Sequence, residues 1–225
     1  MTQLVETTRI VDRVFASLRD AILSGEMPPH TPLSVPELSR QLNVSRSPVR
    51  EAVLQLVASG LAVEHARKGC FVTKIELSDL IEIHDMRSAL EALAVSLVHE
   101  VPSTLVKKLN EQIKHQETAL AHQDWRAFTV ADRFFHECFH ESCGNGRLKS
   151  TLANLRLHME IALLEVAQSP DLMENSIKEH KQIVASLVEN TPEVAAEVMR
   201  NHICSTRNRI WDRLQHESLA EETQQ

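Results

Sequence analysis

The stretch "VSRSPVREAVLQLVASG", residues 44–60, decides how the first third of the chain folds. Its apolar residues recur every three or four positions and form one stripe along a helix. They are Val49, Val53, Leu56 and Val57. Ser45 or Ser47 can cap the start of this helix, Pro48 fits its opening turn, and Gly60 follows its end. The stretch therefore predicts one amphipathic helix with polar and basic residues at its N-terminal end.

Two further helices precede this one, and two strands follow it. Apolar residues at helical spacing from residue 10 to residue 23 predict a first helix that stops before Gly25, and residues 36–42 predict a short second helix. Residues 61–65 and 70–73 predict two strands joined by the basic turn "ARKG". Helix, turn, helix and a two-stranded wing form a winged helix-turn-helix, an arrangement that reads DNA.

From residue 77 onward, the chain is predicted to form about six antiparallel helices, because helical segments alternate with short breaks rich in Pro, Gly and Asn. The fold class is therefore mainly α. We expect a winged helix-turn-helix at residues 1–75 and an all-α antiparallel helical bundle at residues 76–225. The phenylalanines of the second part are expected in its core; they are Phe128, Phe134, Phe135 and Phe139.

Composition and charge exclude several classes of protein. The 225 residues are 43% hydrophobic and 24% charged, which is typical of a folded globular chain, and no window approaches the roughly 18 apolar residues of a membrane span. Four cysteines without a C-x-x-C pair, and an N-terminus without a signal-peptide pattern, predict a cytoplasmic protein with free thiols. Residues 1–75 hold nine Lys/Arg against seven Asp/Glu, whereas residues 76–225 hold fifteen against twenty-four. An anionic partner such as DNA would therefore bind the first part.

The N-terminal end of the third helix and the wing turn carry the candidate DNA-binding residues. In a winged helix-turn-helix, hydroxyl and guanidinium donors at the start of the reading helix reach base edges and phosphates, and a basic wing grips the backbone or the minor groove. These residues are Ser45, Arg46, Ser47 and Arg50 on the helix, and Arg67, Lys68 and Gly69 in the wing. The alternative is a generic three-helix packing unit with solvated arginines.

A second motif, "DRFFHECFH" at residues 132–140, contains His136, Glu137 and His140 in the H-E-x-x-H pattern of zinc hydrolases. In that pattern, the two histidines bind zinc and the glutamate acts as a general base. The extended form of the motif needs a glycine three residues after the second histidine, where this chain has Cys143. The pattern is a weak signal in a chain with twelve histidines.

The segment "LSVPELSRQLNVSRSPVREAVLQLVASGLA" closely resembles the N-terminal DNA-binding domain of the GntR family of bacterial transcription regulators. The resemblance covers about residues 10–74. It implies that Ser45, Arg46, Ser47 and Arg50 contact operator DNA. The second part resembles the FCD ligand-sensing domain of the FadR-type branch of that family, through "HDMRSALEALAVSLV", "DRFFHECFHESCGNGRL" and "EHKQIVASLVENTPEVAAEVMRNHI".

The FCD resemblance implies a metal site, because metal-binding members of this domain use one aspartate and three histidines at the matching positions. Those positions are Asp132, His136, His180 and His202. Asp132 and His136 are four residues apart and share one face of a helix, and the other two histidines lie on later helices that can face inward. Such a set suits zinc first, and also nickel, manganese or cobalt.

Arg87 stands where the same resemblance implies a residue that lines the central cavity. A guanidinium there can hold the carboxylate of a ligand with two hydrogen bonds. The alternative is an ion pair with Glu91, four residues later, at the helix surface.

Together these patterns predict a homodimeric, ligand-responsive transcriptional regulator without catalytic activity, and a repressor by default. Its partners would be a pseudo-palindromic double-stranded operator and a small carboxylate effector, and it would not bind a membrane. Two alternatives stand beside this prediction: a sensor for which the metal itself is the signal, and a metal-dependent hydrolase that uses the H-E-x-x-H motif.

Overall fold

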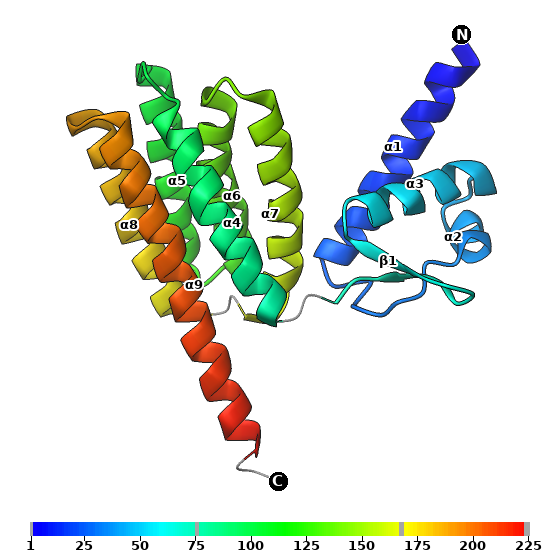
Figure 1. Ribbon diagram of the computed structural model, residues 1–225. Helices are drawn as coiled ribbons and strands as arrows, with labels where there is room; N and C mark the ends of the chain where they lie inside the picture. Colours follow the sequence, from blue (N-terminus) through cyan, green and yellow to red (C-terminus); the bar gives the residue numbers. More distant parts are fainter. Residues whose placement is uncertain (1, 75–76, 167–168, 223–225) are drawn as a thin grey trace. The chain divides into compact units, whose positions relative to one another are not determined.

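The structure is a computed structural model that describes the backbone of residues 2–74, 77–166 and 169–222, and the side chains of residues 10–74, 78–159 and 169–213. Over the described residues it contains nine helices and one two-stranded sheet (Figure 1). In chain order they are α1 (Thr2–Leu23), α2 (Val35–Gln41), α3 (Arg46–Ala58), β1 (Ala62–His65), β2 (Gly69–Val72), α4 (Leu77–Ser96), α5 (Ser103–Ala121), α6 (Trp125–Ser142), α7 (Gly146–Val166), α8 (Pro170–Glu189) and α9 (Pro192–Glu222). The predicted fold class is confirmed: a winged helix-turn-helix precedes an all-helical part.

The winged helix-turn-helix is built around the apolar stripe of α3. Val49 and Leu56 are fully buried there and pack with Leu18 and Ile22 of α1. Ser45 occupies the N-cap position of α3, although its side chain makes no capping hydrogen bond. The helix therefore begins where the sequence predicts it, and packing of its apolar face stabilises it more than its cap does.

The wing follows α3 directly because the chain reverses at Gly60, whose φ of +75° favours glycine. Strands β1 and β2 pair antiparallel, with Ala62 opposite Val72 and His65 opposite Gly69. Both strands lie within one residue of their predicted positions.

The helices α4, α5, α6, α8 and α9 pack around a second core. Packing joins α4 to α9, α5 to α6 and α8, and α8 to α9. Large side chains from these five helices fill the centre; they include Val95, Leu109, Phe135, Ile183 and Met199. The contacts within the chain divide it into two compact units: residues 1–76 together with residues 157–164 of α7, and residues 77–156 together with residues 165–225. None of the described helices is long and apolar enough to cross a membrane.

Side-chain caps and one exposed ring add detail to the helical unit. Asp124 caps α6 by accepting a 2.9 Å hydrogen bond from the Ala127 N–H, and Asn145 caps α7 by accepting a 3.1 Å hydrogen bond from the Leu148 N–H.

Phe135 and Phe139 are buried, as predicted, and Phe128 packs against the same core. Phe134 is 43% exposed, so its predicted core position is wrong. The physical reason is that α6 buries only one face, and Phe134 falls on the other.

Candidate functional site

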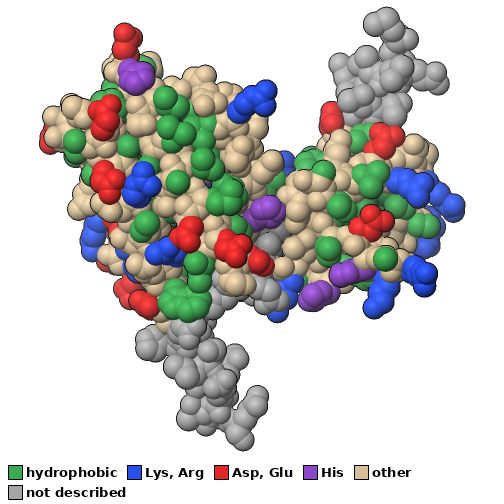
Figure 2. Space-filling model, viewed as in Figure 1, with side chains coloured by type: hydrophobic (Ala, Val, Ile, Leu, Met, Phe, Trp, Pro, Cys, Tyr) green, Lys and Arg blue, Asp and Glu red, His purple; other side chains and the backbone are tan. Residues whose placement is uncertain are grey.

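The predicted DNA-reading residues lie on the exposed side of the winged helix. Pro48, Val49 and Val53 of α3 face the core, which turns Ser45, Arg46 and Arg50 outward. Ser47 is also exposed, and its hydroxyl lies 3.4 Å from Oε1 of Glu51 on the same helix. In Figure 2, lysine and arginine side chains gather along one side of this unit. The arrangement leaves the start of α3 open to a partner.

The wing turn presents a second group of cations. Arg67 adopts φ +64° and Gly69 adopts φ +99°, and the turn closes with a 3.0 Å bond from the Lys68 N–H to the carbonyl of His65. A left-handed conformation is unusual for arginine and is common at functional turns. Arg67 and Lys68 are exposed, so their charges can reach phosphates.

Inside the helical unit, three histidines from three helices meet at one point. His136 of α6, His180 of α8 and His202 of α9 each offer a nitrogen within 4.8 Å of the others, and all three are buried. The Nε2 atoms of His180 and His202 are 3.2 Å apart. Tetrahedral zinc with bonds of about 2.0–2.1 Å places its ligand nitrogens roughly 3.3 Å apart. The spacing of this pair therefore fits a small divalent ion.

The other ring nitrogen of each histidine is held by an oxygen of a neighbouring side chain. Nδ1 of His180 lies 2.9 Å from Oε1 of Gln116, and Nδ1 of His202 lies 2.7 Å from Oε2 of Glu179. Nδ1 of His136 contacts Oε2 of Glu91. When Gln116 and Glu179 accept the Nδ1 protons of His180 and His202, the Nε2 atoms of these two rings keep lone pairs that face each other. This is how proteins orient histidines that bind a metal.

Asp132 adds a carboxylate to the cluster. Its Oδ1 lies 3.8 Å from Nε2 of His180, while its Oδ2 accepts a 3.0 Å hydrogen bond from Arg156 of α7. Arg156 also donates to the carbonyl of Thr129 at 3.4 Å. Burial alone would raise the pKa of Asp132, but Arg156 and the neighbouring histidines hold this pKa well below its usual range. The structure thus brings the three predicted histidine ligands together and places the fourth predicted ligand, Asp132, beside His180.

Burial sets the charge of the histidines. Desolvation lowers the pKa of His136 and lowers that of His180 well below its ordinary value, and His202 lowers the latter further. These two rings are therefore neutral near pH 7, with lone pairs available to bind a metal.

The carboxylate of Glu179, which holds His202, stays ionised. Burial would raise the pKa of Glu179, but hydrogen bonds from His202 and Arg209 lower it to about 2.

Arg87 pairs with Glu91 inside the helical unit. Its Nε and Nη2 lie 2.7 and 2.6 Å from Oε1 of Glu91, and the two side chains are only 5% and 3% exposed. The ion pair considered from the sequence exists, but the expectation that it lies on the helix surface is wrong. The reason is that α4 is covered by α6 and α9, so that this face of the helix points inward.

Comparison with known protein families agrees with both units. A family model described as "FCD domain" matches residues 82–205, more than half of the chain, and one described as "Bacterial regulatory proteins, gntR family" matches residues 10–72. The chain belongs to the GntR family. As a GntR-family regulator with an FCD domain, it is not an enzyme.

Individual relatives of this GntR-family chain are transcriptional regulators. The HTH-type transcriptional repressor RspR of Escherichia coli (strain K12) is 25% identical over 203 residues, which cover 90% of this chain and 89% of RspR. The gluconate operon transcriptional repressor of Bacillus subtilis (strain 168) is 30% identical over 153 residues, covering 68% of this chain and 63% of that protein.

Solved structures support the same fold for this GntR-family chain. E. coli McbR/YncC matches with a TM-score of 0.77 and 22% identity over 91% of this chain and 98% of that one. A GntR transcriptional regulator from Rhodococcus sp. RHA1 matches with a TM-score of 0.76 and 21% identity over 90% and 97%.

The H-E-x-x-H pattern of this GntR-family protein shares only His136 with the histidine cluster of the described side chains. Among the described side chains, the histidine cluster does not include His140. Nε2 of His140 instead lies 3.9 Å from Oε2 of Glu91, which also contacts His136. The hydrolase alternative is therefore wrong, in agreement with the family.

Several residues of the site were not predicted from the sequence. Gln116, Arg156 and Glu179 contact the predicted ligands from α5, α7 and α8. Glu179 directly precedes His180 in the "EHKQI" motif, which is the one local signal for it. Gln116 and Arg156 lie 64 and 24 residues from their partners, so no sequence spacing connects them.

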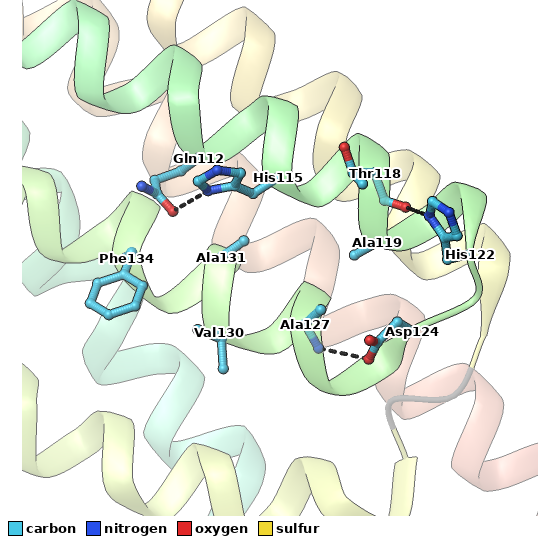
Figure 3. Close-up of a pocket in the computed structure, with 10 residues that line it drawn as sticks. All are labelled: Gln112, His115, Thr118, Ala119, His122, Asp124, Ala127, Val130, Ala131 and Phe134. Carbon is cyan, nitrogen blue, oxygen red and sulfur yellow. Dashed lines mark hydrogen bonds between the residues drawn. The ribbon is translucent and has the colours of Figure 1, made fainter.

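A surface pocket of about 480 Å³ lies outside this cluster, between α5 and α6 (Figure 3). Val130 and Phe134 line it with His115, His122 and the cap residue Asp124. Among its lining residues there is no member of the histidine cluster. It is therefore a separate feature of the FCD unit.

Proposed function

We propose that this GntR-family regulator is a homodimeric repressor that binds a pseudo-palindromic operator, and that a small carboxylate bound with a divalent metal in its FCD unit changes operator affinity. RspR and the gluconate operon regulator named above are repressors, which supports repression of transcription rather than its activation. We further propose that residues 1–75 and 76–225 act as separate DNA-binding and effector-binding domains in the cytoplasm.

The observation that supports the metal proposal is the orientation of His180 and His202, whose ring nitrogens face each other inside the histidine cluster. With Nδ1 of His180 and His202 held by oxygens, two Nε2 lone pairs face each other at 3.2 Å. Two lone pairs at this distance repel each other unless a proton or a cation lies between them. Asp132, His136, His180 and His202 would hold a divalent ion, with zinc the first choice and nickel, manganese or cobalt also suited. Such an ion supplies open coordination positions for an oxygen ligand.

The charge balance of the site favours an anion as the ligand. Among the described side chains, Asp132 pairs with Arg156, Glu91 with Arg87, and Glu179 with Arg209. The charges of these carboxylates and arginines around the histidine cluster therefore cancel in pairs. A divalent ion would add two positive charges to a largely buried place, where an uncompensated charge is costly. A carboxylate offsets this charge, which supports a small organic acid as the effector.

Regulation requires that the effector bind the DNA-bound and DNA-free arrangements of the dimer with different affinity. We propose that the acid favours the DNA-free arrangement and so releases the operator. The alternative is a metal sensor, favoured by the completeness of the four-ligand set. In that case, zinc alone would change operator affinity at micromolar concentration, and a carboxylate would add nothing.

Replacing Arg50 with alanine tests whether the N-terminal end of α3 contacts operator DNA. We expect operator affinity to fall by about 1–3 kcal/mol if Arg50 contacts a base, or the salt dependence to lose about one unit of slope if it contacts a phosphate. Fluorescence anisotropy with a labelled operator fragment, at several salt concentrations, measures both. Arg126→Ala, at an exposed arginine of α6, is the control. Operator affinity and salt slope equal to the unsubstituted protein would remove Arg50 from the interface.

Replacing His140 with alanine separates the two histidine patterns. We expect zinc to remain bound at about one ion per chain, because His140 is not a member of the histidine cluster. Elemental analysis by mass spectrometry measures the zinc content. Loss of the metal from this variant would contradict the ligand set proposed here.

A further inference from the structure

We propose that Gln116 of α5 is a positioning residue that selects the tautomer of His180, and that its amide group turns over when a divalent metal binds. This inference rests on the metal site proposed above. Oε1 of Gln116 lies 2.9 Å from Nδ1 of His180, and both side chains are completely buried. An amide carries an acceptor oxygen and a donor nitrogen in nearly the same shape. Gln116 can therefore offer either atom to the ring.

His202, by contrast, has a partner that permits only one tautomer. Its Nδ1 lies 2.7 Å from Oε2 of Glu179, and an ionised carboxylate can only accept a hydrogen bond. The two oxygens of Glu179 also accept hydrogen bonds from Arg209, at 2.7 and 2.8 Å. Because Arg209 already balances the charge of Glu179, a second proton on His202 would place an uncompensated charge in a buried site. His202 is therefore neutral, with its proton on Nδ1 and a lone pair on Nε2.

The short distance between His180 and His202 then fixes the proton of His180 in the metal-free protein. Their Nε2 atoms are 3.2 Å apart, which is a hydrogen-bonding distance. A proton must lie between these nitrogens, because two lone pairs this close repel each other. His202 has no proton on Nε2, so His180 donates from its own Nε2. Nδ1 of His180 is then a lone pair, and the amide nitrogen of Gln116 can donate to it.

The unused nitrogen of Gln116 supports the same arrangement. When Oε1 faces His180, the buried Nε2 of Gln116 has no hydrogen-bond partner among the described residues. A buried N–H group without a partner is rarer in proteins than an oxygen with unused lone pairs. Turning the amide over gives this nitrogen a partner, Nδ1 of His180.

Metal binding requires the opposite tautomer of His180. A ring that offers its Nε2 lone pair to an ion carries its proton on Nδ1, and this proton needs the oxygen of Gln116 as its acceptor. His180 therefore loses a proton from Nε2 to water and takes one from water at Nδ1, so the ring releases no net proton. Glutamine suits this position because it accepts in one state and donates in the other, whereas glutamate would only accept.

The test locates the ring protons of the full-length protein, with and without zinc, by long-range proton–nitrogen correlation NMR of labelled histidines. The His180 signals are identified by their absence from His180→Ala, and His202 is the internal control. Gln116→Glu provides only acceptors, and Gln116→Met provides neither a strong donor nor a strong acceptor. Gln182→Glu, at an exposed glutamine of α8, is the matched control for the added charge. Competition with a zinc-binding dye measures the zinc affinity of each variant.

We expect His180 to carry its proton on Nε2 without zinc and on Nδ1 with zinc, while His202 keeps its proton on Nδ1 in both states. Gln116→Glu should hold the His180 proton on Nδ1 in both states. Gln116→Met should weaken zinc affinity about 10- to 100-fold, the usual effect of losing the partner of a metal-binding histidine. Gln182→Glu should behave like the unsubstituted protein, with zinc affinity within about threefold of it.

Two results would overturn this inference and leave the proposed metal site standing. One is a His180 proton on Nδ1 both with and without zinc, which would make Gln116 a fixed acceptor. The other is unchanged zinc affinity in Gln116→Met, which would show that Gln116 does not position the ring. If the unsubstituted protein binds no zinc, the proposed function fails together with this inference. The tautomers of the unsubstituted protein decide the question even if a Gln116 variant does not fold.

Discussion

Replacing His180 with alanine is expected to weaken zinc binding by the helical unit strongly. The ring is completely buried, its Nδ1 is held by Gln116, and its Nε2 faces that of His202 at 3.2 Å. A four-ligand zinc site has an apparent binding free energy of about 10–16 kcal/mol, so losing one ligand should weaken zinc affinity on the order of a hundred-fold or more. Competition with a zinc-binding dye measures this affinity.

The same substitution should also remove the thermal stabilisation that zinc provides. Ligands on α6, α8 and α9 join three helices through one ion, and a ligand at a thousand times its Kd stabilises the folded state by about 4.1 kcal/mol. Removing the ring also leaves a cavity beside Phe135, whose ring stacks on that of His180 at 3.9 Å. The informative quantity is therefore the zinc-dependent change in Tm within each protein.

The control for this experiment is His115→Ala, at an exposed histidine of α5. It should keep both the zinc affinity and the zinc-dependent rise in Tm. Zinc affinity of His180→Ala equal to that of the unsubstituted protein would remove His180 from the ligand set.

Replacing Arg87 with methionine is expected to lower the free energy of unfolding by about 3–5 kcal/mol. Methionine preserves much of the volume of the side chain but leaves the carboxylate of Glu91 buried at 3% exposure without its cation. Urea unfolding of the zinc-free protein, followed through its helical signal, measures the loss. The exposed Arg126→Met should change stability by less than about 0.5 kcal/mol.

A double variant shows whether the lost charge pair causes this effect. Arg87→Met combined with Glu91→Leu removes both charges, and replacing a whole buried ion pair with apolar residues is often neutral or stabilising. We therefore expect the double variant to recover most of the stability lost in Arg87→Met. If Arg87→Met alone costs less than about 1 kcal/mol, the pair does not stabilise the helical unit.

The elements of the fold could be predicted from local patterns in the sequence. Val49, Val53 and Leu56 recur at helical spacing, and Gly60 ends the helix, so α3 and the wing that follows it were placed within one or two residues. These features depend on neighbours only three or four positions away. Phe134 was predicted wrongly, because it is apolar but lies on the exposed face of an amphipathic helix. The sequence pattern does not show which face of the helix another helix covers.

The sequence by itself determined the two-part mainly helical architecture and the cations at the start of the reading helix, whereas the four residues proposed as metal ligands came from the resemblance to the FCD domain. Local periodicity and dense motifs contain that information. Only the tertiary structure decided which side chains hold those ligands, because Gln116, Arg156 and Glu91 reach them from helices distant in the sequence. It also decided that the Arg87–Glu91 pair is buried, since the burial of a charge depends on which helices cover it and not on the spacing of its own residues.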